Sequence, residues 1–163
     1  MKKFFCLLFT VVLFGCDDGD MIVKNFNFGD SAVLSCSEDS DFIYKVNGTE
    51  AFILKIQPSS FIGVPAVRTA TIPQAGFVYR NYTATAGSSV ICSELPPSTP
   101  TVAEEWTSVA GGTVKIETLE RRDEDNILLG HTHTITFTSL TVTKGDEQIV
   151  LDGVTYGTFS TNL

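Results

Sequence analysis

The sequence has few of the residues on which enzymes and nucleic-acid-binding proteins depend. It has 2 histidines among 163 residues, and its 11 Lys and Arg face 19 Asp and Glu, for a net charge of −8. There is no run of Lys or Arg, which argues against nucleic acid as a partner and against electrostatic binding to anionic membranes. Long helix-forming stretches are missing too, while the hydrophobic fraction of 43% is typical of a globular chain. We therefore expect one globular domain that binds no nucleic acid.

Recognisable catalytic motifs are also missing. The serines lack a GxSxG setting, and the two histidines form neither an HxxxH nor an HExxH pattern. We therefore expect no enzymatic activity and no cofactor.

The first residues have the pattern of an export signal. Lys2 and Lys3 precede an apolar run from Phe4 to Phe14, which Gly15 and Cys16 close. Eleven residues rise only about 16 Å as a helix, roughly half of a bilayer's hydrocarbon core, so the run is too short to span a membrane. A charged start, a short apolar stretch and a small final residue are typical of a secretory signal.

The end of that run, Leu13-Phe14-Gly15-Cys16, resembles a bacterial lipoprotein signal. The resemblance implies cleavage between Gly15 and Cys16 and acylation of the Cys16 thiol and of the freed amine. Two or three acyl chains hold a protein on a membrane durably. The alternative is an ordinary signal peptide with an unrelated cysteine. We expect residues 1–15 to be a signal peptide, residues 16–21 an acidic tether, and residues 22–163 a single all-β domain.

Cleavage would make the chain more acidic. Losing Lys2 and Lys3 leaves 9 basic residues against 19 acidic ones, a net charge of −10. Three aspartates, at positions 17, 18 and 20, follow the lipidation site directly. Such a cluster resembles inner-membrane retention signals in enteric bacteria and surface-export signals in the Bacteroidota, and it also suits a plain solvated tether. We expect a cell-envelope location as an outer-membrane lipoprotein that faces the periplasm or the surface.

A family resemblance supports this expectation. The segment 16–23, followed by Phe26 and Phe28, looks like small lipoproteins of the Bacteroidota, flavobacterial ones in particular. The segments 112–116 and 131–137 are similar in style to the same group. The resemblance implies a location and an all-β fold, and it implies no activity.

The cysteines predict one disulfide. Cys6 lies in the signal and Cys16 would carry lipid, which leaves Cys36 and Cys92 to pair in an oxidising compartment. Closing a loop of about 57 residues would contribute roughly 4 kcal/mol in the chain-entropy account. The alternative is a pair of buried free thiols.

The body of the chain reads as short strands separated by Gly- and Pro-rich turns. Asn47-Gly48 predicts a hairpin turn between strands at 42–46 and 51–56, with Phe42, Tyr44 and Val46 on one face. The segment 101–110 fits a helix or a strand, and we favour the strand. Residues 57–75 read as a long connection or as edge strands. Further strands are expected at 22–28, 32–36, 77–83, 90–92, 113–119, 131–142, 148–151 and 155–159. About ten short strands predict an antiparallel β-sandwich or a flattened barrel.

The segment 131–142 carries two further signals. Apolar residues fall on odd positions up to Phe137 and on even positions from Leu140, which predicts a one-residue bulge near Thr138-Ser139. The even positions 132–138 are all Thr. Such a face is ordinary for a solvated strand, and it could also bind a glycan or a repeating surface.

His131 and His133 are the weak candidates for a metal site, because they project from the same strand face. Two histidines need a third ligand, which Asp123, Glu124 or Asp125 could supply through a hairpin. We expect instead that both histidines lie at the rim of the core and that no metal binds.

Three functions remain open from the sequence. The first is a lipid-anchored, non-catalytic envelope module that binds a protein or glycan partner or contributes to an envelope complex. The second is a lipocalin-like carrier of small apolar ligands, which needs an apolar cavity of about 300 Å³ or more. The third is a metal-dependent enzyme that uses His131 and His133.

Overall fold

The computed structural model describes residues 25–61 and 63–163, which form an antiparallel β fold. Its described part holds ten strands, one 3₁₀ turn and one four-residue helix. The strands are β1 (Leu34–Ser35), β2 (Ile43–Asn47), β3 (Glu50–Leu54), β4 (Ala66–Ile72), β5 (Phe77–Tyr82), β6 (Val102–Ser108), β7 (Gly112–Arg122), β8 (Leu128–Lys144), β9 (Glu147–Leu151) and β10 (Val154–Asn162). The turn is η1 (Pro58–Ser60) and the helix is α1 (Ser88–Ile91). The predicted all-β class is confirmed.

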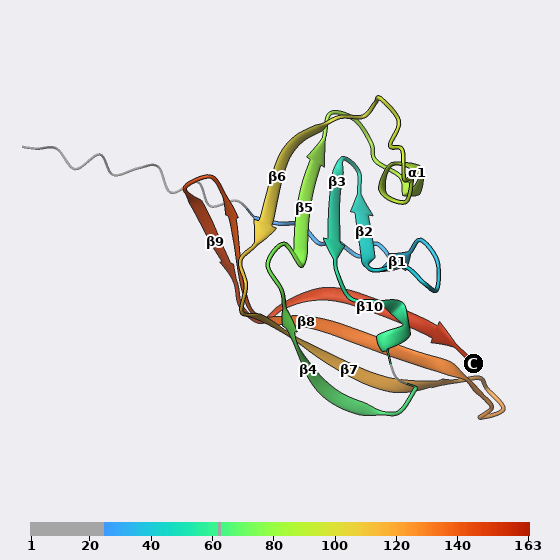
Figure 1. Cartoon of the computed structure of the whole chain (residues 1–163). Helices are drawn as coiled ribbons and strands as arrows, with labels where there is room; N and C mark the ends of the chain where they lie inside the picture. The colour runs from blue at the N-terminus through green and yellow to red at the C-terminus, as the bar shows by residue number, and fades with distance from the viewer. Residues whose placement is uncertain (1–24, 62) are drawn as a thin grey trace, which may run out of the picture.

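The strands form two layers that share one long strand. Sheet A has the order β1-β2-β3-β5-β6-β8-β9, and sheet B has the order β4-β7-β8-β10. In Figure 1 the strands of sheet A run steeply across those of sheet B, and β8 passes from one layer into the other. The sheet is not closed, so of the two predicted architectures the structure has the sandwich-like one.

A bulge lets β8 serve both layers. Thr113 of β7 pairs with Ser139, and the next residue, Val114, pairs with Phe137, so Thr138 is the extra residue. The side chains of Phe137 and Leu140 consequently both point into the core, and both are fully buried. The bulge predicted from the phase change in the sequence is confirmed.

Aromatic side chains from both sheets fill the space between the layers. The Phe28 ring lies 4.7 Å from that of Phe52 in sheet A and 5.9 Å from that of Phe137 in sheet B. Tyr156 is fully buried, and its hydroxyl donates to the Phe52 carbonyl at 2.8 Å. The buried cluster is Phe26, Phe28, Val33, Ile43, Phe52, Leu54, Phe61, Ile72, Phe77, Tyr79, Trp106, Val114, Ile135, Phe137, Leu140, Val142, Leu151, Tyr156 and Phe159.

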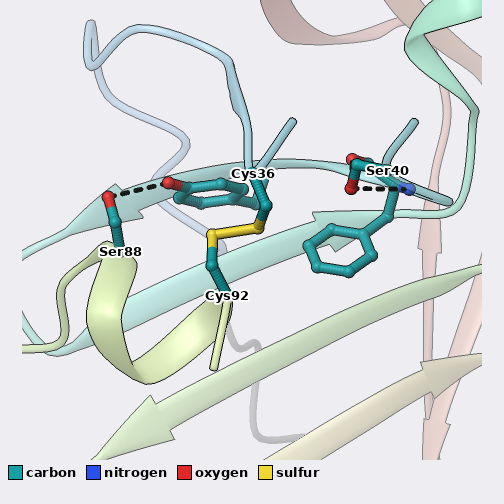
Figure 2. The surroundings of a disulfide bond; sticks show 6 residues. Cys36, Ser40, Ser88 and Cys92 are labelled. Carbon is teal, nitrogen blue, oxygen red and sulfur yellow. Dashed lines mark hydrogen bonds between the residues drawn. A yellow bond between two sulfur atoms is a disulfide. The ribbon is translucent and has the colours of Figure 1, made fainter. Parts of the chain in front are cut away.

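A small second cluster covers the outer face of sheet A. Residues of α1 and of the loop before it pack on β3 and β5, where Val90 and Ala86 lie against Ala51 and Tyr82. Figure 2 shows the Cys36–Cys92 disulfide, which joins the end of α1 to the segment before β2. The predicted strand at 90–92 is therefore wrong, because Val90 belongs to a helix that this cluster holds against the sheet.

The predicted first hairpin is formed by β2 and β3, but its turn lies one residue later than expected and the face of Phe42, Tyr44 and Val46 is not the one that meets the main core. Asn47 still pairs with Glu50, so the turn is made by Gly48, with a φ of 63°, and Thr49. The core side of β2 carries Ile43 and Lys45, whereas Tyr44 points to the α1 side. Because both faces of sheet A are covered there, apolar alternation alone does not identify the core side.

Other predicted segments are placed as follows. The segment 101–110 is a strand over Val102–Ser108, as expected. In the described part of the predicted strand at 22–28, Phe26 and Phe28 are buried, but residues 25–28 form no ladder. The irregular stretch 57–75 contains η1 and the edge strand β4. Cys16 and the tether 16–21 lie outside the described residues.

Candidate functional site: histidine pair, buried lysine and edge groove

His133 is held inside the core between two threonine hydroxyls. Strand β8 places it opposite Thr118 of β7, and its Nδ1 lies 3.0 Å from Thr118 Oγ1. Its Nε2 lies 3.0 Å from Thr161 Oγ1 on β10. A neutral imidazole donates one hydrogen bond and accepts another, and each hydroxyl can fill either role, so both ring nitrogens are satisfied. Phe61 covers the ring, with its centroid 4.8 Å away.

This setting disfavours the charged form of His133. Its side chain has no exposed surface. Burial, and then the nearby His131 and Arg68, lower the pKa of His133 to about 4. The ring is therefore neutral at neutral pH, and its role is to fill space and join β7, β8 and β10 through hydrogen bonds.

His131 lies beside His133, but the described residues provide no third ligand. It is 5% exposed, and its ring centroid lies 6.4 Å from that of His133. Glu120 pairs with His131 across the ladder, but its carboxylate binds Arg122 at the surface. Asp123, which we considered as a ligand, accepts from the backbone of its own turn. Within residues 25–61 and 63–163, no group of three His, Cys, Asp or Glu side chains could hold a metal ion.

The predicted disulfide between Cys36 and Cys92 is present in the structure. The Cys36 and Cys92 Cα atoms are 5.5 Å apart, and the two sulfur atoms are bonded. Beside them, the Tyr44 hydroxyl donates to Ser88 Oγ at 2.8 Å, which links α1 directly to β2 (Figure 2).

Lys45 is an unexpected member of the core face. It is 2% exposed, and its Nζ donates to the Gly29 carbonyl at 2.9 Å and to the Tyr156 carbonyl at 3.1 Å. Burial lowers the pKa of Lys45 from its ordinary value, and the charge of Asp30 partly offsets this. The ammonium thus ties the segment before β1 to β10 in the other sheet. Sequence reasoning missed it because a lysine in an alternating strand normally marks the solvent side.

Two hollows open along β10, on the side where the sandwich is not closed. One, of about 520 Å³, is lined by residues 28–32, Lys45 and residues 155–158. The other, of about 850 Å³, lies between residues 32–35 of one wall and residues 158–163 of the other. We call this second hollow the edge groove. It is also lined by Pro58, Ser59 and Phe61, and by Glu38 and Asp39, which follow β1 in the chain. Both hollows are open to solvent, and neither is an enclosed apolar cavity.

The threonine face lies on the outer side of sheet B. Thr132, Thr134 and Thr136 pair across the ladder with Ser160, Thr158 and Thr155 of β10. Thr138 and Thr113 bond to each other through their hydroxyls at 2.7 Å. An ion pair between Lys115 and Glu117 interrupts this face, and the interacting groups are half-exposed. In the part of the chain that the structure describes, this face is a solvated sheet surface that carries no aromatic side chain.

Comparisons with protein families, curated proteins and solved structures find no significant match to this chain. The helices of the described residues include none with the length and apolarity needed to cross a bilayer.

Proposed function

We propose that this protein is a lipid-anchored, non-catalytic module of the cell envelope that binds a partner. The observation that carries the proposal is the pattern of Lys2, Lys3, the apolar run and the closing sequence Leu13–Cys16. The resemblance of that pattern to a lipoprotein signal implies an anchor at Cys16 and a folded domain outside the cytoplasm.

The disulfide gives independent support for export. A bond between Cys36 and Cys92 would not persist in a reducing cytoplasm, whereas envelope compartments favour it. It also leaves no other cysteine in the mature chain except Cys16, which suits a protein whose remaining thiol carries lipid.

The site geometry favours binding over the other two functions. The core between the sheets is filled by aromatic rings, and the hollows are open at the surface, so no feature of the described chain favours a carrier of apolar ligands. His133 uses both ring nitrogens in bonds to threonines, so a metal could not bind it without breaking one of them. An open groove along a strand edge is a shape that accepts a partner.

The experiment is fatty-acid labelling of the whole chain expressed in a bacterium that processes lipoproteins. Wild-type protein should incorporate an alkyne-tagged palmitate and partition into the detergent phase. Cys16→Ala should lose both properties and retain its signal peptide. Cys6→Ala, which alters a cysteine inside the signal, is the matched control and should behave as wild type. Membrane partitioning and labelling that survive Cys16→Ala would refute the proposal.

A further inference from the structure

The edge groove lies between two strand edges that have no partner in the described chain. Strand β1 pairs with β2, and strand β10 pairs with β8, each along one side. The described backbone makes no hydrogen bond from β10 to residues 32–35 across the groove. Apart from the Tyr156 carbonyl, which Lys45 binds, the outward N–H and C=O groups of β10 have no hydrogen-bond partner in the described chain, so they can accept another strand.

The β10 edge is unusual in being unprotected. Natural edges usually carry charged residues or proline, which discourage pairing with other chains. The edge strand β4 contains Arg68 and the edge strand β9 contains Glu147, whereas β1 is only two residues long. Strand β10 has nine residues and no charge or proline among them. Its bulge at Tyr156 is confined to one end, where Lys45 already binds the carbonyl.

The groove is acidic on its rim and apolar at its base. Glu38 and Asp39 are exposed, and in the described part of the chain neither forms an ion pair. The residues that line the groove include no Lys, Arg or His. At its base, Phe61, Phe159 and Val33 present small remaining surfaces, each at 5–8% exposure. Alternate side chains of an added strand would meet this apolar base.

We infer that the edge groove binds an extended, positively charged peptide segment of a partner protein, which adds as a strand to β10. Main-chain hydrogen bonds would supply general affinity, and the rim carboxylates and apolar base would select basic and apolar side chains. This inference rests on the proposed partner-binding function and names the chemistry of the partner.

Charge argues against the other occupants. A second copy paired through β10 would bring two sets of Glu38 and Asp39 near one groove, and like charges repel. The chain's own tether, residues 16–21, carries three aspartates and no basic residue. A basic segment from another protein complements the rim.

The test measures peptide binding to the full chain purified in detergent. The probe is a fluorescent heptapeptide, Lys-Val-Thr-Val-Lys-Val-Lys, followed by fluorescence anisotropy. We expect saturable binding, weakened at least tenfold, or about 1.4 kcal/mol, when glutamate replaces each lysine of the probe. A probe with alternate N-methylated amides should weaken by a similar factor, because methylation removes the ladder donors on one edge.

Two matched charge reversals locate the site. The double variant Glu38→Lys/Asp39→Lys should lower affinity at least tenfold, or about 1.4 kcal/mol. The double variant Asp146→Lys/Asp152→Lys changes net charge equally at two exposed residues in the turns on either side of β9 and should keep affinity within about twofold, because salt screens distant charges. A further variant, Ala32→Trp, places a large side chain at an exposed position of the groove wall. It should block the groove and lower the affinity for the probe by a similar factor.

Hydrogen exchange separates strand addition from loose electrostatic attraction. Amides of β10 should exchange more slowly when the basic probe is bound, while amides of β4 and β9 should not change. Equal binding of the N-methylated probe, equal loss in the two charge-reversal variants, a dimer that excludes the probe, or no binding would each overturn the inference. These results do not depend on acylation of Cys16, so they are distinguishable from failure of the anchoring proposal.

Discussion

Lowering the pH should reduce the free energy of unfolding of this protein, because His133 binds a proton more weakly in the folded state than in the unfolded state. The folded-state pKa of His133 is about 4, against about 6.5 for an unfolded chain. The unfolded state therefore binds the proton more tightly, and stability falls as pH decreases through that window. From pH 7 to pH 5 the loss from this single group is about 2 kcal/mol, and it approaches about 3 kcal/mol near pH 4.

The variant His133→Gln removes the titrating group and keeps a side chain that can bond to the two threonines. At pH 7 the free energy of unfolding of the variant, measured in urea, should be lower than that of wild type. Between pH 7 and pH 5 the wild-type value should fall by about 2 kcal/mol more than the variant's value. Carboxylates titrate in both proteins, so the difference between the two pH profiles isolates His133. An NMR titration of the His133 ring should show a midpoint near pH 4. Parallel stability profiles, or a midpoint near 6.5, would refute the reasoning.

Two further outcomes follow from the links between sheets and segments. Replacing both Cys36 and Cys92 with serine should lower the free energy of unfolding, measured in urea without reductant, by up to about 4 kcal/mol. The reason is that the two positions, 56 residues apart, are then no longer linked in the unfolded chain. Stability equal to that of wild type would contradict this. Lys45→Met should cost about 1–3 kcal/mol, because two backbone carbonyls in the interior lose their donor. Thermal unfolding measures the second effect, and a melting temperature at or above wild type would show that the ammonium contributes no net stability.

The sequence predicted this fold best where a single strand had one buried face. In 131–142 the alternation of His131, His133, Ile135 and Phe137, and its change of phase, predicted both the core face and the bulge. The disulfide was predicted because only Cys36 and Cys92 remain once Cys6 is assigned to the signal peptide and Cys16 to the lipid. The alternation of apolar residues along one strand and the number of cysteines are both properties of the sequence alone. Neither requires knowledge of the tertiary contacts.

Prediction failed where a neighbour distant in sequence decides the outcome. Lys45 faces the core because the carbonyls of Gly29 and Tyr156, one of them 111 residues away, accept its hydrogen bonds. Val90 is helical because the outer face of sheet A and the disulfide hold it there. The edge groove could not be predicted either, since it depends on which strands end each sheet, and alternation does not encode strand order.

The sharing of β8 by both layers affects when the chain can fold. Residues 128–144 supply Phe137 and Leu140 to the core, and β10 follows them only near the end of the chain. A polypeptide that crosses a membrane from its N-terminus therefore cannot close the sandwich until most of it has passed. Such long-range pairing also makes folding slow compared with local helix formation. Both properties would delay the folding of an exported precursor, which suits the export route that we propose.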